Sequence, residues 1–182
     1  MKAAILAVSA FVAPLAAQPE PPFADIPGIA FAYYDVPGGT LAAIRSSIER
    51  LRLIDPNDRQ GVDALSNWSW RWSWKVGAGG CDLAGATLSF EASVRMPRLA
   101  DRTAVPAQVL AHWDDYIAAL ERHEAWHVRN GYSGRAEIQA AIAGATCATA
   151  DAAALAAVRR IGLRDQDYDR RTHHGIDEGA TF

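Results

Sequence analysis

Two stretches near the middle of the chain alternate strictly between hydrophobic and polar positions. In residues 68–75 four tryptophans alternate with serine, arginine or lysine, and in residues 86–94 apolar residues alternate with polar ones. Successive side chains of a β-strand point to opposite faces, so both stretches predict amphipathic strands. The glycine-rich turn at 77–80 predicts that they form an antiparallel pair. An earlier aromatic and apolar run at 31–36 predicts a first strand.

Helical spacing of apolar residues appears first after Thr40. This threonine is suited to cap a helix because its hydroxyl can accept a hydrogen bond from a free backbone N–H of the first turn. Leu41, Ile44, Ile48 and Leu51 follow at intervals of three and four residues. The spacing predicts a helix with these four side chains on its inward side.

A longer helix is predicted from Pro106 onward, where apolar residues again recur three and four positions apart. Glu124 and His127 continue the inward stripe of this helix. The pair Asn130-Gly131 is a stop signal, although the apolar spacing continues beyond it. The pattern therefore leaves open whether this region is one helix or two.

The predicted strands and helices together indicate a single α+β domain over residues 31–182. The alanine-rich residues 149–164 predict the last helix, and the polar, glycine-containing residues 167–182 predict a loop. A chain of 182 residues has room for one hydrophobic core. We expect a small antiparallel sheet, one long helix and further helices in this domain.

The first thirty residues precede this domain. Lys2 and the apolar run after it predict a signal peptide, residues 1–17, that is removed on export. The run is shorter than the roughly 20 residues of a membrane-spanning helix, which disfavours a membrane anchor. Residues 18–30 contain four prolines and predict an extended leader. The mature protein is thus expected to be secreted or periplasmic, without stable membrane insertion.

Charge and cysteine content add two constraints. The formal net charge is −3 and the positive residues form no block, so nucleic acid is not an expected partner. The chain has two cysteines, Cys81 and Cys147. In an oxidising compartment they favour one disulfide over two buried free thiols.

The strongest chemical signal is the segment His123-Glu124-Ala125-Trp126-His127 in the long predicted helix. Residues four apart project from the same side of a helix, one turn apart. Two imidazoles so placed can both reach one zinc ion at about 2.0–2.1 Å. Glu124 beside them can act as general base toward a water molecule whose pKa zinc lowers to about 7. The alternative is a metal-free pairing of both histidines with neighbouring carboxylates.

A catalytic zinc site needs a third protein ligand. His112 lies about 16 Å from His123 along an unbroken helix, and Glu137 is excluded on the same ground unless the helix breaks at Gly131. The other histidines are His173 and His174 in the C-terminal segment. That segment can return to the metal, or both histidines can be solvated near a frayed terminus. The residues alone leave this choice open.

The chain resembles the bacterial domain-of-unknown-function family 922, whose members are described as predicted secreted zinc-dependent proteases. The resemblance covers most of the chain from residue 33 to the C-terminus. It rests on the tryptophan strand, the two cysteines, the motif at 123–127 and the tail from Tyr168-Asp169 to Gly179. It implies a zincin-like fold, in which a short sheet packs beside the active-site helix.

The resemblance also implies roles for residues of the tail. It implies His174, and not His173, as the third zinc ligand. Asp169 is the alternative ligand, or an acceptor that holds a ligand imidazole in place. Tyr168 is a candidate catalytic residue that donates a hydrogen bond to the oxyanion of a tetrahedral intermediate. The alternative for Tyr168 is packing of the tail against the core.

Together these features predict an exported zinc-dependent hydrolase, a metallopeptidase acting on a peptide or protein. The zincin-like resemblance implies that an extended substrate pairs with an edge strand above the metal, and either predicted strand of the hairpin could provide that edge. The tryptophan row itself is better explained as core, because each indole buries about 150–250 Å². Two alternatives stay open: zinc hydrolysis of a non-peptide amide, and a zinc-stabilised or metal-free binding module without catalysis.

Overall fold

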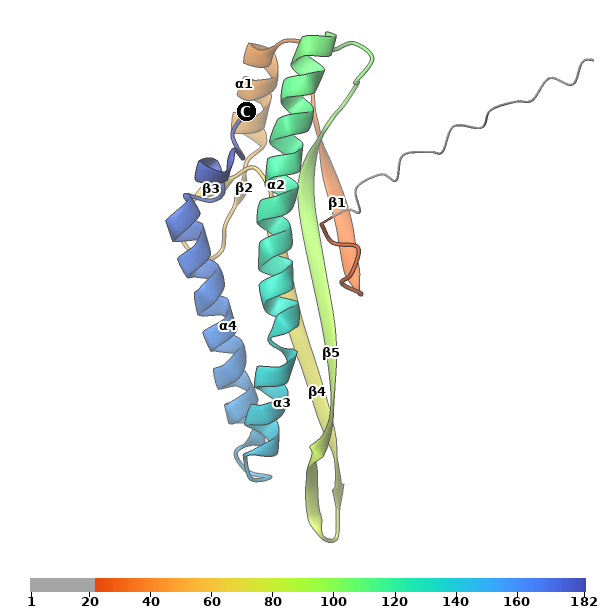
Figure 1. The fold of residues 1–182 in the computed structure, drawn as a ribbon, viewed down its shortest axis with the longest axis vertical. Helices are drawn as coiled ribbons and strands as arrows, with labels where there is room; N and C mark the ends of the chain where they lie inside the picture. The colour runs from red at the N-terminus through yellow and green to blue at the C-terminus, as the bar shows by residue number, and fades with distance from the viewer. Residues whose placement is uncertain (1–21) are drawn as a thin grey trace, which may run out of the picture.

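The computed structural model describes residues 22–182, so the predicted signal peptide and the start of the predicted leader lie outside the described part. Figure 1 shows a long β-hairpin (65–99) that runs lengthwise beside the helices at 107–133 and 150–172, with the shorter helices at 41–51 and 135–143 toward opposite ends of the molecule. The elements in chain order are β1 (Ile29–Val36), α1 (Leu41–Leu51), β2 (Leu53–Ile54), β3 (Gly61–Val62), β4 (Leu65–Gly77), β5 (Gly80–Leu99), α2 (Ala107–Ser133), α3 (Arg135–Ala143), α4 (Ala150–Thr172) and the 3-10 helix η1 (Ile176–Glu178).

The main sheet has three strands in the order β1-β5-β4. β4 and β5 form the predicted antiparallel pair, in which Trp68 lies opposite Ala92. β1 adds to the other side of β5 in parallel, with Ile29 opposite Ala92 and Val36 opposite Leu99. The α+β class is confirmed, and the sheet is mixed where an antiparallel one was expected. A parallel pair needs a long connection, which the chain between β1 and β5 provides.

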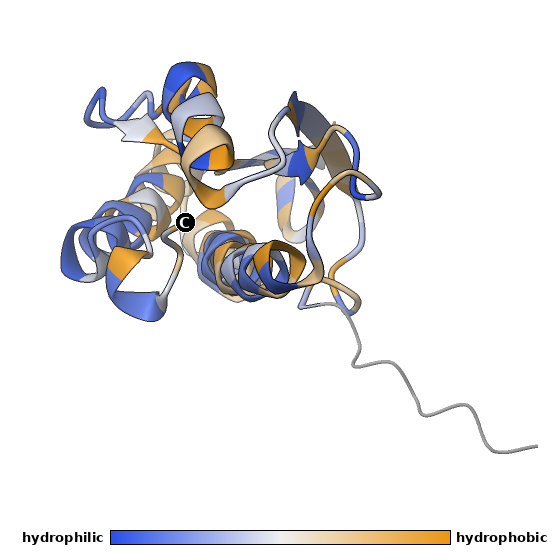
Figure 2. Ribbon diagram, turned by 90° about the horizontal axis from the view of Figure 1, so that it is seen from above, coloured by the Kyte–Doolittle hydropathy of each residue, from blue (hydrophilic) through white to orange (hydrophobic). Residues whose placement is uncertain are grey.

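The tryptophan row lies on the face of the sheet that the helices cover, and Figure 2 shows the helices gathered on one side of the strands. Trp70 is buried among apolar side chains of α3 and α4, and the other three indoles pack partly buried against the same cluster. The Nε1 of Trp70 donates to the Gly131 carbonyl at 2.9 Å, and that of Trp72 donates to Asp151 at 2.8 Å. The prediction that this row is core is confirmed for Trp70, whereas the other three indoles are half-buried and Trp68 also lines a cleft.

α1 begins as predicted, with the Thr40 hydroxyl accepting a hydrogen bond from the backbone N–H of Ala43. Ile44 and Ile48 are completely buried. Leu41 and Leu51 are 48% and 40% exposed, so their predicted inward position was wrong. They lie in the two terminal turns, and only the central turns of α1 bury their apolar side.

α2 continues through Asn130 and Gly131 and ends at Ser133, after which α3 begins at Arg135. The region is therefore two helices, but the break comes after Asn130 and Gly131 and not at them. Gly131 is required for packing and does not end the helix, since a Cβ there would lie 2.5 Å from the Cγ of Trp68.

α4 is longer than predicted and extends to Thr172, so the loop expected from residue 167 was wrong over its first turns. Asp167 forms ion pairs with Arg170 and Arg171, which stabilises the last turn. His173 then ends the helix in a left-handed conformation, with φ at 50°. The extra turns matter because they place Tyr168 and Asp169 on a helix.

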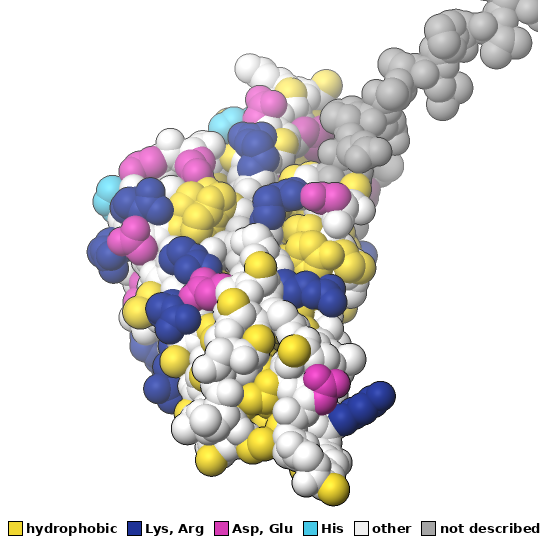
Figure 3. Space-filling model, turned by 60° about the horizontal axis from the view of Figure 1, so that its bottom comes forward, with side chains coloured by type: hydrophobic (Ala, Val, Ile, Leu, Met, Phe, Trp, Pro, Cys, Tyr) yellow, Lys and Arg dark blue, Asp and Glu magenta, His cyan; other side chains and the backbone are white. Residues whose placement is uncertain are grey.

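The disulfide between Cys81 and Cys147 is confirmed and ties the start of β5 to the α3–α4 connection. Figure 3 shows this end of the molecule, where Lys and Arg side chains are interspersed with Asp and Glu. On α4, Arg160 and Arg164 both pair with Glu137 of α3. Among residues 22–182, no helix is long and apolar enough to cross a membrane.

Candidate metal centre

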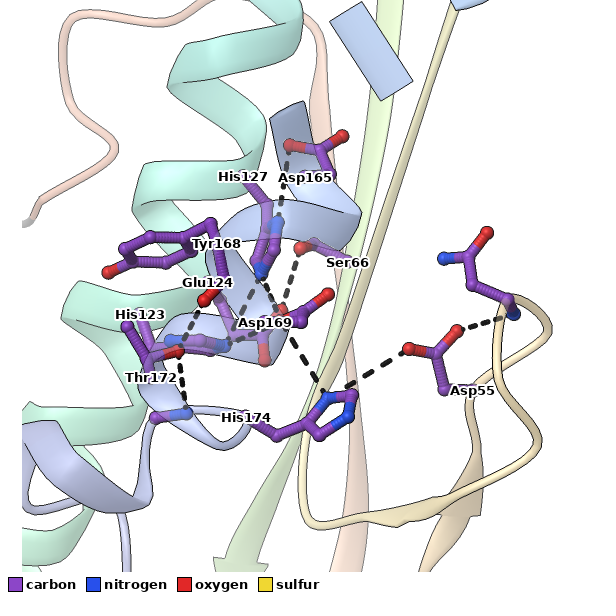
Figure 4. A network of polar contacts seen from close by, with 12 residues as sticks. Asp55, Ser66, His123, Glu124, His127, Asp165, Tyr168, Asp169, Thr172 and His174 are labelled. Atoms are coloured by element: carbon purple, nitrogen blue, oxygen red, sulfur yellow. Dashed lines mark hydrogen bonds and ion pairs between the residues drawn. The ribbon is translucent and has the colours of Figure 1, made fainter. Parts of the chain in front are cut away.

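Two neighbouring helices present polar side chains to each other near the middle of the molecule (Figure 4). α2 carries His123 and His127 one turn apart, and α4 carries Asp165 and Asp169 with the same spacing. Residues four apart lie on one face of a helix, so each helix contributes a pair to the shared surface. Both histidines are buried, with exposed fractions of 3% and 8%.

Three potential ligand atoms converge at this point. The Nε2 atoms of His123 and His127 are 3.3 Å apart. Oδ1 of Asp169 lies 3.2 Å from the Nε2 of His123 and 2.9 Å from that of His127. Ligands that bind a tetrahedral zinc ion at about 2.0–2.1 Å are about 3.3 Å from one another. The three atoms therefore already have nearly the spacing that a zinc ion requires.

The other nitrogen of each imidazole is held by a carboxylate. Nδ1 of His123 is 2.9 Å from Oε2 of Glu178 in η1, and Nδ1 of His127 is 3.2 Å from Oδ1 of Asp165. Such partners fix the ring orientation and leave Nε2 free for a metal ion. The tail lies close to this point, since a Cβ on Gly175 would be 2.9 Å from the Cγ of His123.

The carboxylates also shift the protonation of both imidazoles. Burial alone would lower the pKa of His127, but hydrogen bonds to Asp165 and Asp169 outweigh it and raise this pKa to about 10. Burial would also lower the pKa of His123. Hydrogen bonds to Asp169 and Glu178 and the negative charge of Glu124 outweigh this effect and raise the pKa. In the absence of a metal, the centre holds protons that a cation would displace.

Glu124 lies beside these histidines and is only 4% exposed. Burial raises the pKa of its carboxyl group, and its Oε2 accepts a hydrogen bond of 2.6 Å from the Ser66 hydroxyl. Ser66 belongs to β4. A single serine in an alternating strand carries no signal in the sequence, so this residue was not predicted.

The centre opens into a cleft of about 270 Å³. Its walls are formed by α2, α4, the start of β4 and the segment around β2 and β3. Glu124 and both histidines line this cleft, together with residues 65–68 of β4. β4 is an edge strand of the main sheet. The cleft thus joins a potential metal site to a strand edge.

His174, the predicted third ligand, lies next to the centre. Its Nδ1 is 3.7 Å from Oδ1 of Asp169, and its Nε2 is 2.9 Å from Oδ2 of Asp58. Asp169, the alternative ligand, contacts both α2 histidines directly. His173 is exposed and pairs with Asp177. The structure thus brings His174 and Asp169 to the site and keeps His173 away from it.

Tyr168 of α4 packs against the α2 segment at 123–127. Its ring stacks on Trp126 with a centroid distance of 3.8 Å and on His123 at 5.0 Å. Its hydroxyl donates to Oε1 of Glu178 at 2.6 Å, so it supports the carboxylate that holds His123. This contact accords with the packing alternative, and the role of Tyr168 as an oxyanion donor stays a prediction.

The fold and this centre define an α+β protein with a His, His and Asp cluster that could hold a metal ion. The chain belongs to the family DUF922, described as a bacterial protein of unknown function, whose model matches residues 31–175. No curated protein and no solved structure is significantly similar to it. The matched range contains the α2 motif, Asp169 and His174.

Proposed function

We propose that this chain is a zinc-dependent hydrolase, a metallopeptidase that acts outside the cytoplasm. The observation that carries the proposal is the spacing of 2.9–3.3 Å among three ligand atoms beside a buried glutamate. His123, His127 and Asp169 are the residues that would hold the ion. A zinc ion bound there would polarise a substrate carbonyl and acidify a water molecule. The disulfide supports export, because such bonds persist in oxidising compartments.

Glu124 supplies the acid–base chemistry of the proposed reaction. Its carboxylate accepts a proton from the attacking water and passes it to the leaving amine. Ser66 donates to Oε2 and so leaves Oε1 for this transfer. The burial that raises the pKa of Glu124 brings it closer to neutral pH, where a group can both accept and release a proton.

The edge of β4 supports a peptide as substrate. Residues 65–68 line the cleft, and within residues 22–182 no strand pairs with the outer edge of β4. The free N–H and C=O groups of an edge strand can form main-chain hydrogen bonds with an extended peptide. A peptide bound in this way runs past the carboxylate of Glu124.

The variant Glu124→Gln tests the proposal because it keeps the size of the side chain and removes the base. We expect peptide cleavage to fall by about 10²–10⁴-fold, the usual contribution of a general base, with the zinc at His123 retained. Cleavage is measured by mass spectrometry on a peptide library with the zinc-loaded protein, with and without chelator. Glu121→Gln on the same helix is the control, since Glu121 does not line the cleft.

Two results would count against this function. Equal cleavage by Glu124→Gln and the unaltered protein would refute the role of Glu124. A zinc-loaded protein that cleaves no peptide would favour the alternative of a binding module, in which His123→Ala lowers thermal stability or partner binding without any loss of hydrolysis.

A further inference from the structure

We propose that the chain has a second site for a divalent metal ion, formed by Asp55, Asp58 and His174. This site lies beside the His123 centre and does not depend on the proposed peptidase activity. Asp55 and His174 line the same cleft as the first cluster. Figure 4 shows the His174 ring between Asp55 and Asp169.

The three side chains bring suitable ligand atoms together. Each offers one such atom, and these atoms all lie within 4.8 Å of one another. Oδ2 of Asp58 is 2.9 Å from Nε2 of His174, and Oδ2 of Asp55 is 4.0 Å from its Nδ1. Two carboxylate oxygens and one imidazole nitrogen form a donor set suited to zinc or manganese.

Asp55 provides a second, independent indication of a ligand. Its side chain is only 5% exposed. Oδ1 accepts a hydrogen bond of 2.7 Å from the backbone N–H of Asn57. Oδ2 has no hydrogen-bond donor among residues 22–182 and faces the cleft with His174 as its nearest ionic partner. Oδ2 therefore remains accessible from the cleft as a free acceptor on an otherwise buried carboxylate, a position from which it can bind a cation.

The position of His174 determines how ligands divide between the two sites. Its ring lies 3.7 Å from Oδ1 of Asp169 and 2.9 Å from Oδ2 of Asp58. Since Asp169 already completes a triad with His123 and His127, His174 is available to the second triad. We therefore assign Asp169 to the first site and His174 to the second. Adjacent metal sites in one cleft are a recurring arrangement in hydrolases.

The test is a metal titration of the full chain after removal of bound metal with chelator. Zinc chloride and, separately, manganese chloride are titrated by calorimetry, and the retained metal is measured by atomic absorption after gel filtration. We expect the unaltered protein to bind two equivalents of at least one of these ions. In Asp55→Asn/Asp58→Asn one equivalent should be lost or weakened at least tenfold, as expected when a metal site is disturbed.

Asp101→Asn is the matched control for this pair of substitutions. Like Asp58, Asp101 is an exposed aspartate whose Oδ1 accepts a backbone N–H two residues later, and it lies outside the cleft. It should leave both equivalents unchanged. Circular dichroism verifies the fold, and Asp58→Asn alone replaces the double variant if the latter does not fold, because Asp58 is on the surface.

The outcomes separate this site from the proposed function. A single equivalent that is lost in His123→Ala and kept in Asp55→Asn/Asp58→Asn would overturn the second site and leave the first intact. A single equivalent with the opposite behaviour would support the second site and contradict the zinc centre of the peptidase. Two equivalents unaffected by Asp55→Asn/Asp58→Asn, or no bound metal at all, would overturn the second site.

Discussion

Burial and neighbouring carboxylates act in opposite directions on His127. Burial would lower its pKa, whereas Asp165 and Asp169 stabilise the imidazolium and raise the pKa from 6.5 to about 10. Asp169 is affected reciprocally, since burial would raise its pKa but the two histidines keep it well below its ordinary value. A group whose pKa is higher in the folded than in the unfolded state stabilises the fold while it is protonated.

We therefore expect the free energy of unfolding of the metal-free protein to fall as the pH rises. The contribution of His127 is fully present below about pH 6.5, the pKa of an unfolded histidine, and is lost as the pH rises through about 10. Urea unfolding in chelator between pH 6 and pH 10 measures this change. Stability that is constant over this range would contradict the charge distribution described for the centre.

The stabilisation of the protein by zinc should depend on pH in the opposite direction, so it serves as the control. A metal ligand must lose its proton, so the stabilisation gained from saturating zinc should increase with pH over the same range. The variant His127→Gln should weaken both trends, because it removes the group that exchanges a proton for the metal.

At the scale of helices and strands, the sequence predicts the elements whose two faces differ in polarity. The β4–β5 hairpin and the start of α2 follow this rule. The rule fails at the end of α4 because the inward face carries Asp165 and Asp169 in place of apolar residues. The polar residues that indicated a loop there include Asp169, which belongs to the candidate site.

Contacts between distant segments carry no local signal either. Ser66 and Glu124 are 58 positions apart, and only the packing of α2 against β4 brings them within 2.6 Å. The parallel pairing of β1 with β5 was unpredicted for the same reason. The motif on α2 was readable because both its histidines lie within one helical turn, whereas the choice among Asp169, His173 and His174 needed the folded tail.

Gly131 brings α2 into close contact with Trp68 of β4, and this contact links packing to the metal centre. A Cβ at this position would lie 2.5 Å from the Cγ of Trp68. The Trp68 Nε1 donates to Oδ2 of Asp165 at 2.7 Å, and Asp165 in turn holds His127. A displaced indole would therefore disturb a ligand imidazole.

We expect Gly131→Ala to lower the free energy of unfolding by about 1–3 kcal/mol, the usual cost of overpacking, and to weaken zinc binding. Gly162→Ala in α4 is the control, since a Cβ there meets no atom within 4 Å. That substitution should stabilise the protein by about 0.5–1 kcal/mol, because alanine is the better helix former. Urea unfolding and zinc titration compare the two variants, and equal behaviour would refute the packing argument.

At the scale of the whole molecule, two apolar clusters lie along its length. One contains side chains of β1, α1, β5 and most of the length of α2, and the other contains the tryptophan row with α3 and α4. Trp68 and Phe90 contact both clusters. The metal centre lies where α2 and α4 face each other, so both clusters support it from either side.

The disulfide fastens the second cluster at the end remote from α1 (Figure 1). It joins residues 66 positions apart, and a crosslink of this length lowers the entropy of the unfolded chain by an amount worth about 4 kcal/mol. We expect Cys81→Ser/Cys147→Ser to lose stability of this order in urea unfolding. Zinc affinity under native conditions should stay within a few-fold, because the ligands are held by α2, α4 and η1. A folded variant that no longer binds zinc would contradict this expectation. It would show that the geometry of the metal centre depends on the disulfide, although the disulfide contacts none of the ligands.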